Sequence, residues 1–79
     1  MKLSDLRLRV KEKLEVSDEK AHAITTAVFD SIEQGLREDQ DVRISGFGRF
    51  QSRPKRKGGS QGQVLFQASI GLRARVHGK

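Results

Sequence analysis

The chain has 79 residues, enough for one small domain, with 34% hydrophobic and 33% charged residues. It contains no cysteine, which excludes disulfides, thiolate metal sites and a cysteine nucleophile. Its longest apolar runs have only three residues, too short for a membrane-spanning helix or a signal-peptide core. So few apolar side chains make a small core, and we expect the chain to associate with itself.

Charge is divided unevenly along the chain. All ten acidic residues lie at or before Asp41, and residues 1–41 carry seven Lys or Arg, a net charge of −3. Residues 42–79 carry nine Lys or Arg and no acid, a net charge of +9. An acid-free half with this many cations indicates a surface that binds a polyanion. The alternative is a positive surface that only keeps the chain soluble.

Two amphipathic helices are predicted first, over residues 4–14 and about 18–38, and together they form a helical hairpin over 4–38. Ser4 and Ser17 are the predicted N-caps, and acidic residues follow each of them. Apolar side chains recur at helical spacing in both segments: Leu6, Val10 and Leu14 in the first, and Ala21, Ile24, Val28, Ile32 and Leu36 in the second.

The period changes to two after residue 40, which predicts a three-stranded sheet over 41–67. Gly46-Phe47-Gly48 separates the first two strands, and its glycines allow positive φ or a bulge. A short basic arm over 53–63 joins the second strand to the third. Ser69 is predicted to cap a last helix within residues 69–77. The predicted fold class is therefore α+β, in the order α-α-β-β-β-α, with residues 1–79 forming a single domain.

One stretch resembles a known family. Residues 27–32 (Ala-Val-Phe-Asp-Ser-Ile), followed by residues 42–50 (Val-Arg-Ile-Ser-Gly-Phe-Gly-Arg-Phe), are similar to the bacterial histone-like proteins HU and integration host factor. Residues 66–72 resemble the entry into that family's last helix. The similarity covers residues 1–53 and resumes near Val64.

The resemblance implies a nucleoid-associated, cytoplasmic DNA-binding protein that organises and condenses the bacterial chromosome. It implies an intertwined homodimer, or a heterodimer with a related subunit, with helices at its base and two sheets that form a saddle on double-stranded DNA. In the family, a long β-ribbon arm extends from each subunit into the minor groove, and a proline near its tip wedges between base pairs.

The arm of this chain departs from that pattern. Only fifteen residues separate Phe50 from Phe66, and they contain no Asn-Pro pair. Pro54 precedes the basic cluster and lies away from the Gly-Gly-Ser-Gln-Gly turn, so we do not assign it the wedge role. The sequence therefore predicts weak or altered DNA bending, with binding that rests on phosphate contacts.

The candidate DNA-binding residues share positive charge or a place at a helix start or turn. They are Arg53, Lys55, Arg56 and Lys57 on the arm, Arg43 and Arg49 on the strands, Arg73 and Arg75 on the last helix, and, by family analogy, Lys2, Ser4, Ser45 and Gly46. Other readings stay open for three of these sites: Ser4 as a simple N-cap, Arg75 as compensation of the helix dipole, and residues 55–57 as a solvated charge run. The candidate dimer core is Phe29, Ile32, Phe47, Phe50 and Phe66.

Other function classes have little support in the sequence. His22 and His77 have no carboxylate or second ligand at a diagnostic spacing, so we expect no enzyme, no metal, no cofactor and no small-molecule substrate. A membrane partner is not expected either, since the most basic stretch lacks bulky apolar anchors. Two alternatives to duplex DNA binding are a dimeric scaffold that captures proteins and a binder of structured RNA.

Overall fold

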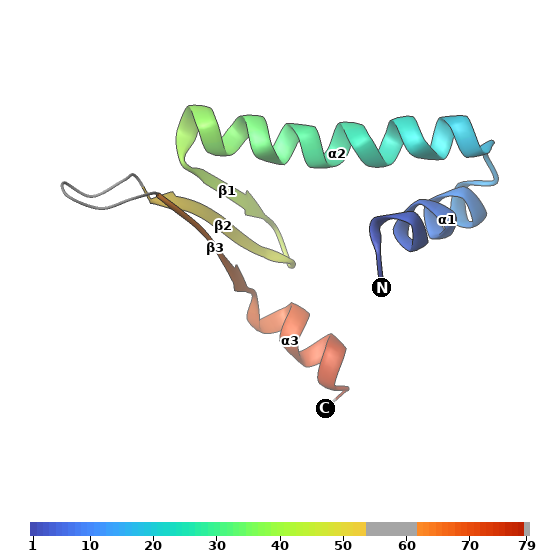
Figure 1. Ribbon diagram of the computed structural model, residues 1–79. Coiled ribbons are helices and arrows are strands. Elements are labelled where there is room, and N and C mark those ends of the chain that lie inside the picture. The colour runs from blue at the N-terminus through green and yellow to red at the C-terminus, as the bar shows by residue number, and fades with distance from the viewer. Residues whose placement is uncertain (54–61, 79) are drawn as a thin grey trace. The chain divides into compact units, whose positions relative to one another are not determined.

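The computed structural model describes residues 1–53 and 62–78. Within them the elements run α1 (Leu3–Leu14), α2 (Asp18–Asp39), β1 (Asp41–Ile44), β2 (Gly48–Arg53), β3 (Gln63–Ala68) and α3 (Ile70–His77) (Figure 1). The predicted α+β class and the element order are confirmed. The chain divides into two compact units, Met1–Ile32 and Glu33–Lys79, which are described separately below.

The first unit holds α1 and most of α2, and hydrogen bonds at the helix ends fix where each begins. The predicted N-cap Ser4 is wrong, because α1 begins at Leu3 and its cap is Lys2. The backbone N–H of Lys2 donates to the Asp5 carboxylate at 2.7 Å, so an acid in the first turn secures the start. Ser17 is confirmed as a cap of α2, since its Oγ accepts from the Lys20 N–H at 3.1 Å.

The contact between α1 and α2 buries very little. Among the described residues, the buried side chains are Ala21, 1% exposed, and Thr25, 5% exposed, and both lie on α2. The Thr25 hydroxyl donates to the Ala21 carbonyl at 2.8 Å, which satisfies its polar group within the helix. Polar contacts add to the hairpin: Arg7 Nη1 lies 2.9 Å from His22 Nδ1, and Lys11 pairs with Asp18 at 2.9 Å.

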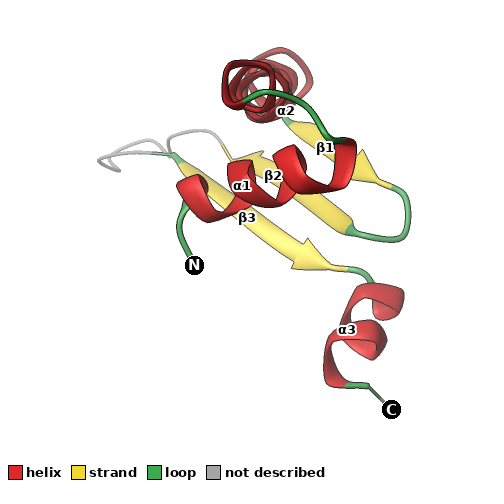
Figure 2. Ribbon diagram, turned by 90° about the vertical axis from the view of Figure 1, so that its right-hand side faces the viewer, coloured by secondary structure: helices red, strands yellow, loops and turns green. Residues whose placement is uncertain are grey.

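The second unit is built on an antiparallel sheet in the order β1-β2-β3, with α3 continuing from the end of β3 (Figure 2). The register pairs Val42 with Phe50 and Phe50 with Phe66, so these side chains share one face. The Phe50 and Phe66 rings lie 4.7 Å apart between centroids, and Phe47 lies 5.7 Å from Phe66. Phe66 and Phe47 remain 45% and 42% exposed, which leaves this apolar face open.

The turn between β1 and β2 needs both of its glycines, for different reasons. Gly46 has φ of +73°, which confirms the predicted positive φ, whereas Gly48 does not adopt it. A Cβ on Gly48 would lie 2.6 Å from the Phe66 ring and 2.7 Å from the Gln67 carbonyl oxygen. Gly46 is therefore needed for its positive φ, and Gly48 is needed because a side chain there would collide with β3.

The last helix is capped as predicted, because the Ser69 side chain accepts from the Leu72 N–H at 2.9 Å. Its backbone is also attached to the turn: the Ser69 N–H donates to the Phe47 carbonyl at 2.9 Å. The arm residues 54–61 lie outside the described residues, and so does the predicted placement of Pro54.

The two turn glycines give a test of these different roles. Gly46→Asn should be nearly neutral, since Asn tolerates positive φ, while Gly46→Ala should cost about 1–2 kcal/mol of unfolding free energy. Gly48→Asn and Gly48→Ala should both cost about 1–3 kcal/mol, because any Cβ there is crowded. Denaturant titrations at one protein concentration would measure all four variants. Equal losses for Gly46→Asn and Gly48→Asn would contradict this assignment.

Candidate nucleic-acid interface

The strand register places a row of cations on one face of the sheet. Arg43 pairs directly with Arg49, and Arg49 with Gln67, so these three side chains share a face. Arg53 lies four residues beyond Arg49 on β2, on the same face and about 13 Å further along the strand. Its strand partner is Gln63. This face is called the cationic face below; its residues are Asp41, Arg43, Arg49, Gln51, Arg53, Gln63, Leu65 and Gln67.

Asp41 is the one acid on this face, and it joins two of the arginines. Arg49 Nε donates to Asp41 Oδ1 at 2.8 Å, and Arg43 Nε donates to Asp41 Oδ2 at 2.9 Å. The hydrogen bond from Arg49 is the largest of the causes that hold the pKa of Asp41 below its ordinary value of 3.8. Asp41 is therefore ionised at neutral pH and balances one of the two positive charges.

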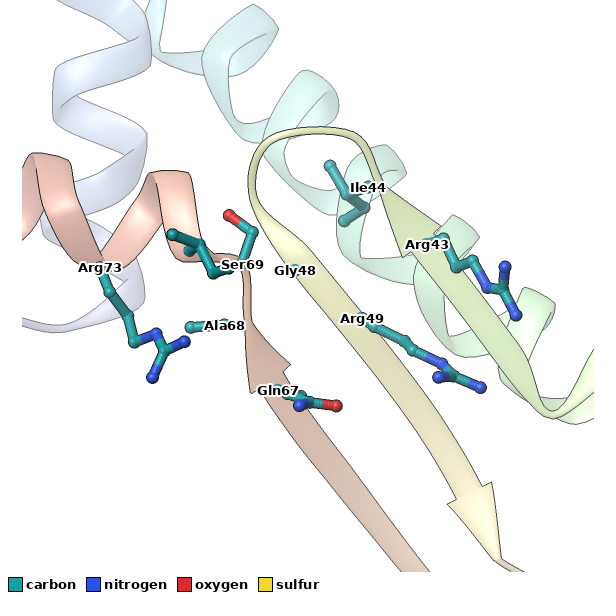
Figure 3. A pocket seen from close by; sticks show the side chains of 9 residues that line it. Arg43, Ile44, Gly48, Arg49, Gln67, Ala68, Ser69 and Arg73 are labelled. Carbon is teal, nitrogen blue, oxygen red and sulfur yellow. The ribbon is translucent and has the colours of Figure 1, made fainter.

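A hollow of about 510 Å³ opens at the edge of the cationic face, where β1, β2 and β3 meet the start of α3. Figure 3 shows that Arg43 and Arg49 extend from neighbouring strands, that Gln67 lies on β3, and that Arg73 comes from α3. The sheet and the last helix thus bring three of the predicted cations to one hollow. A concave surface with several guanidinium groups suits the oxygens of a phosphate chain.

Other predicted site residues are placed elsewhere. Ser45 and Gly46 are exposed in the turn that follows β1. Arg75 donates from Nη2 to the Gly46 carbonyl, so this guanidinium links α3 to the turn. Lys2 and Ser4 are exposed at the start of α1, in the other unit. Lys55, Arg56 and Lys57 lie outside the described residues.

The candidate dimer-core residues fall in both units. Phe47, Phe50 and Phe66 form the aromatic cluster on the apolar face of the sheet. Phe29 is 46% exposed on α2, and Ile32 is partly buried on the same helix.

Sequence reasoning missed two features of the cationic face. It treated Asp41 only as the last acid in the chain, although its spacing of two from Arg43 places both side chains on one face of a strand. It also left out Gln51, Gln63 and Gln67, which the same alternation puts beside the arginines. The spacing of Asp41 and Arg43 can be seen in the sequence. The pairing of Asp41 with Arg49 can be known only from the register of β1 against β2.

Residues 1–53 and 62–78 contain no cluster of three or more His, Cys, Asp or Glu side chains able to hold a metal ion. In the same residues no helix combines the length and the apolar character needed to cross a membrane.

The family model of the bacterial DNA-binding proteins matches residues 1–76 of the chain. The chain belongs to this family. A relative of this bacterial DNA-binding protein is the integration host factor subunit alpha of Chromohalobacter salexigens, 37% identical over 54 residues. That match covers 68% of this chain and 53% of the relative, so the chain matches about half of the relative's length.

A solved structure supports the same assignment for this bacterial DNA-binding protein. The HU protein of Anabaena, cocrystallised with DNA, is similar with a TM-score of 0.79 and 25% sequence identity. The similarity covers 96% of this chain and 97% of the Anabaena chain. The expected resemblance to HU and integration host factor is thus confirmed.

The pairing of Asp41 predicts an acid-dependent loss of stability. Because its pKa is lower in the folded chain than in the unfolded chain, the stabilisation is fully present above about pH 4 and is lost as the pH falls through the folded-state pKa. Thermal unfolding of the wild type and of Asp41→Asn between pH 2.5 and pH 6 would test this. The wild-type melting temperature should fall more steeply below pH 4, and parallel curves would show that Asp41 contributes nothing.

Proposed function

We propose that the chain is a nucleoid-associated protein that binds double-stranded DNA without sequence preference, as a two-subunit body, through phosphate contacts. The observation that carries this proposal is the cationic face with Arg43, Arg49 and Arg53 in register and Arg73 beside it. Cations on a sheet face neutralise backbone phosphates and release counterions, which requires no particular base sequence.

The composition of the cationic face also favours phosphate over base recognition. Its other side chains are mainly glutamines, which donate and accept hydrogen bonds without adding charge. Phe50 and Phe66 lie on the opposite face of the sheet, where their rings contact each other at a tilt of 46°. A binder of single strands would present its rings to the bases, so duplex DNA is the better ligand.

A second copy of the chain is the best occupant for the exposed apolar surface. Val64 is 65% exposed and Phe66 45% exposed on the apolar face of the sheet. In the helical unit, Leu6, Val10, Ile24, Val28 and Phe29 line a groove of about 430 Å³. Two units that each leave large apolar side chains uncovered cannot account for a stable monomer, so we assign these surfaces to subunit association.

Salt dependence is the direct test of the phosphate contacts. A body that neutralises about six phosphates should give a slope of about −5 for log K against log salt in mobility-shift titrations. Arg53→Gln should weaken binding on every duplex sequence and reduce the slope by about 0.9, because Arg53 would neutralise one phosphate.

Arg37→Gln provides the matched control. It removes the same charge from α2, where Arg37 pairs with Glu33, and it should leave the slope unchanged. Binding that is insensitive to salt, or no shift with any duplex, would refute the proposed function. Competition with single-stranded DNA and structured RNA in the same titration would show whether duplex DNA is preferred.

The short arm leads to a separate prediction about bending. Without an apolar wedge at the arm tip, the chain should not insert between base pairs, so it should bend DNA weakly. Ring closure of DNA fragments shorter than the persistence length, about 150 base pairs, should show little enhancement by the protein. Strong enhancement would mean that the arm still kinks the duplex.

A further inference from the structure

Two arginines of the cationic face stand directly opposite each other. Arg43 and Arg49 are paired across β1 and β2, a position where like charges destabilise a sheet. Their side chains are 73% and 39% exposed, so both reach solvent. Without a counter-charge, the two guanidinium groups would repel each other and move apart, and the site would have no defined binding geometry.

A single carboxylate, that of Asp41, is hydrogen-bonded to both arginines. Its two oxygens bond different arginines, Oδ1 to Arg49 at 2.8 Å and Oδ2 to Arg43 at 2.9 Å. Only the Nε–H of each guanidinium is used in these bonds. Of the five N–H donors on each arginine, four have no partner within residues 1–53 and 62–78, and these include the terminal fork that binds phosphate oxygens in pairs.

We propose that Asp41 is a positioning residue for the DNA backbone, which holds Arg43 and Arg49 side by side as one seat for a phosphate group. This inference rests on the proposed DNA binding and deepens it. The Asp41 carboxylate accepts from the Nε–H group of each arginine, and the terminal N–H groups of both arginines remain available to a phosphate. The arginines therefore lose little freedom when a phosphate arrives, because their geometry is already fixed.

Simple charge counting predicts the opposite effect for Asp41. Removing an acid raises the formal net charge from +6 to +7, which by itself strengthens attraction to DNA. In Asp41→Asn, however, the amide keeps one acceptor oxygen and turns an NH2 donor toward the second arginine. Positioning and net charge thus act on DNA affinity with opposite signs, and a measured affinity separates them.

The experiment measures the duplex affinity of the full chain at one low salt concentration for wild type, Asp41→Asn and Asp39→Asn. Asp39 lies at the end of α2 and has no side-chain hydrogen bond within the described residues, so its variant makes the same charge change without the arginine pair. We expect Asp39→Asn to bind up to about twofold tighter. We expect Asp41→Asn to bind about fivefold weaker.

A second background separates positioning from a general loss of folding. With Arg43→Gln and Arg49→Gln already present, Asp41 has nothing to hold, and adding Asp41→Asn should tighten binding by the same factor as Asp39→Asn. Weakening by Asp41→Asn in this background too would show a structural role and overturn the inference. Tightening by Asp41→Asn in the wild-type background would overturn it as well, since Asp41 would then only repel DNA.

The failure of this inference is distinguishable from failure of the proposed function. If the wild type itself does not bind duplex DNA, both are refuted. If the wild type binds with a steep salt dependence and Asp41→Asn follows Asp39→Asn, only the positioning role is lost.

Discussion

The strict alternation of side chains along three paired strands is the constraint on which the site depends. With Val42, Phe50 and Phe66 aligned on one face, the register leaves Arg43 and Arg49 no place except the other. A slip of one residue would exchange the faces and place the arginines of the slipped strand on the side of the aromatic rings. The aromatic cluster is therefore what fixes the geometry of the charges behind it.

The same alternation gives the two faces of the sheet different chemistry. The aromatic face is apolar and remains open in one chain, which makes it suitable for contact with a second subunit. The opposite face is cationic and polar, suitable for a polyanion. In the proposed assembly, subunit association and DNA binding therefore occupy opposite sides of the same sheet, and neither requires the other's side chains.

Much of this could be read from the sequence. The helical spacing of the apolar residues in 4–14 and 18–38 predicted two helices, and the change to period two at residue 41 predicted the sheet. Ser17 and Ser69 were recognised as caps because each precedes an apolar, helical stretch. Ser4 was not a cap, since the Asp5 carboxylate, bonded to the Lys2 backbone, begins the helix earlier. Local hydrogen-bond competition of this kind is decided by geometry that a sequence pattern does not contain.

The charged site was predictable only in part. Positive charge on the predicted strands marked Arg43 and Arg49 as candidate DNA-binding residues, but the sequence gave no partner for either side chain. The bonds from Asp41 to both arginines depend on which residue of β2 lies opposite β1, and that register is a tertiary property. Likewise, Arg75 was named as a DNA-binding candidate because of its charge. Its hydrogen bond to the Gly46 carbonyl could not be predicted, because it joins residues 29 positions apart in the chain.

The two links between the first hairpin turn and the C-terminal helix carry a mechanical consequence. Ser69 bonds the Phe47 carbonyl, and Arg75 bonds the Gly46 carbonyl. An eight-residue helix is too short to persist alone in water, so these links help to keep α3 folded. The same two hydrogen bonds also restrict the conformation of the glycine-containing turn between β1 and β2. Shortening the chain by its last turn would thus loosen a loop more than twenty residues earlier.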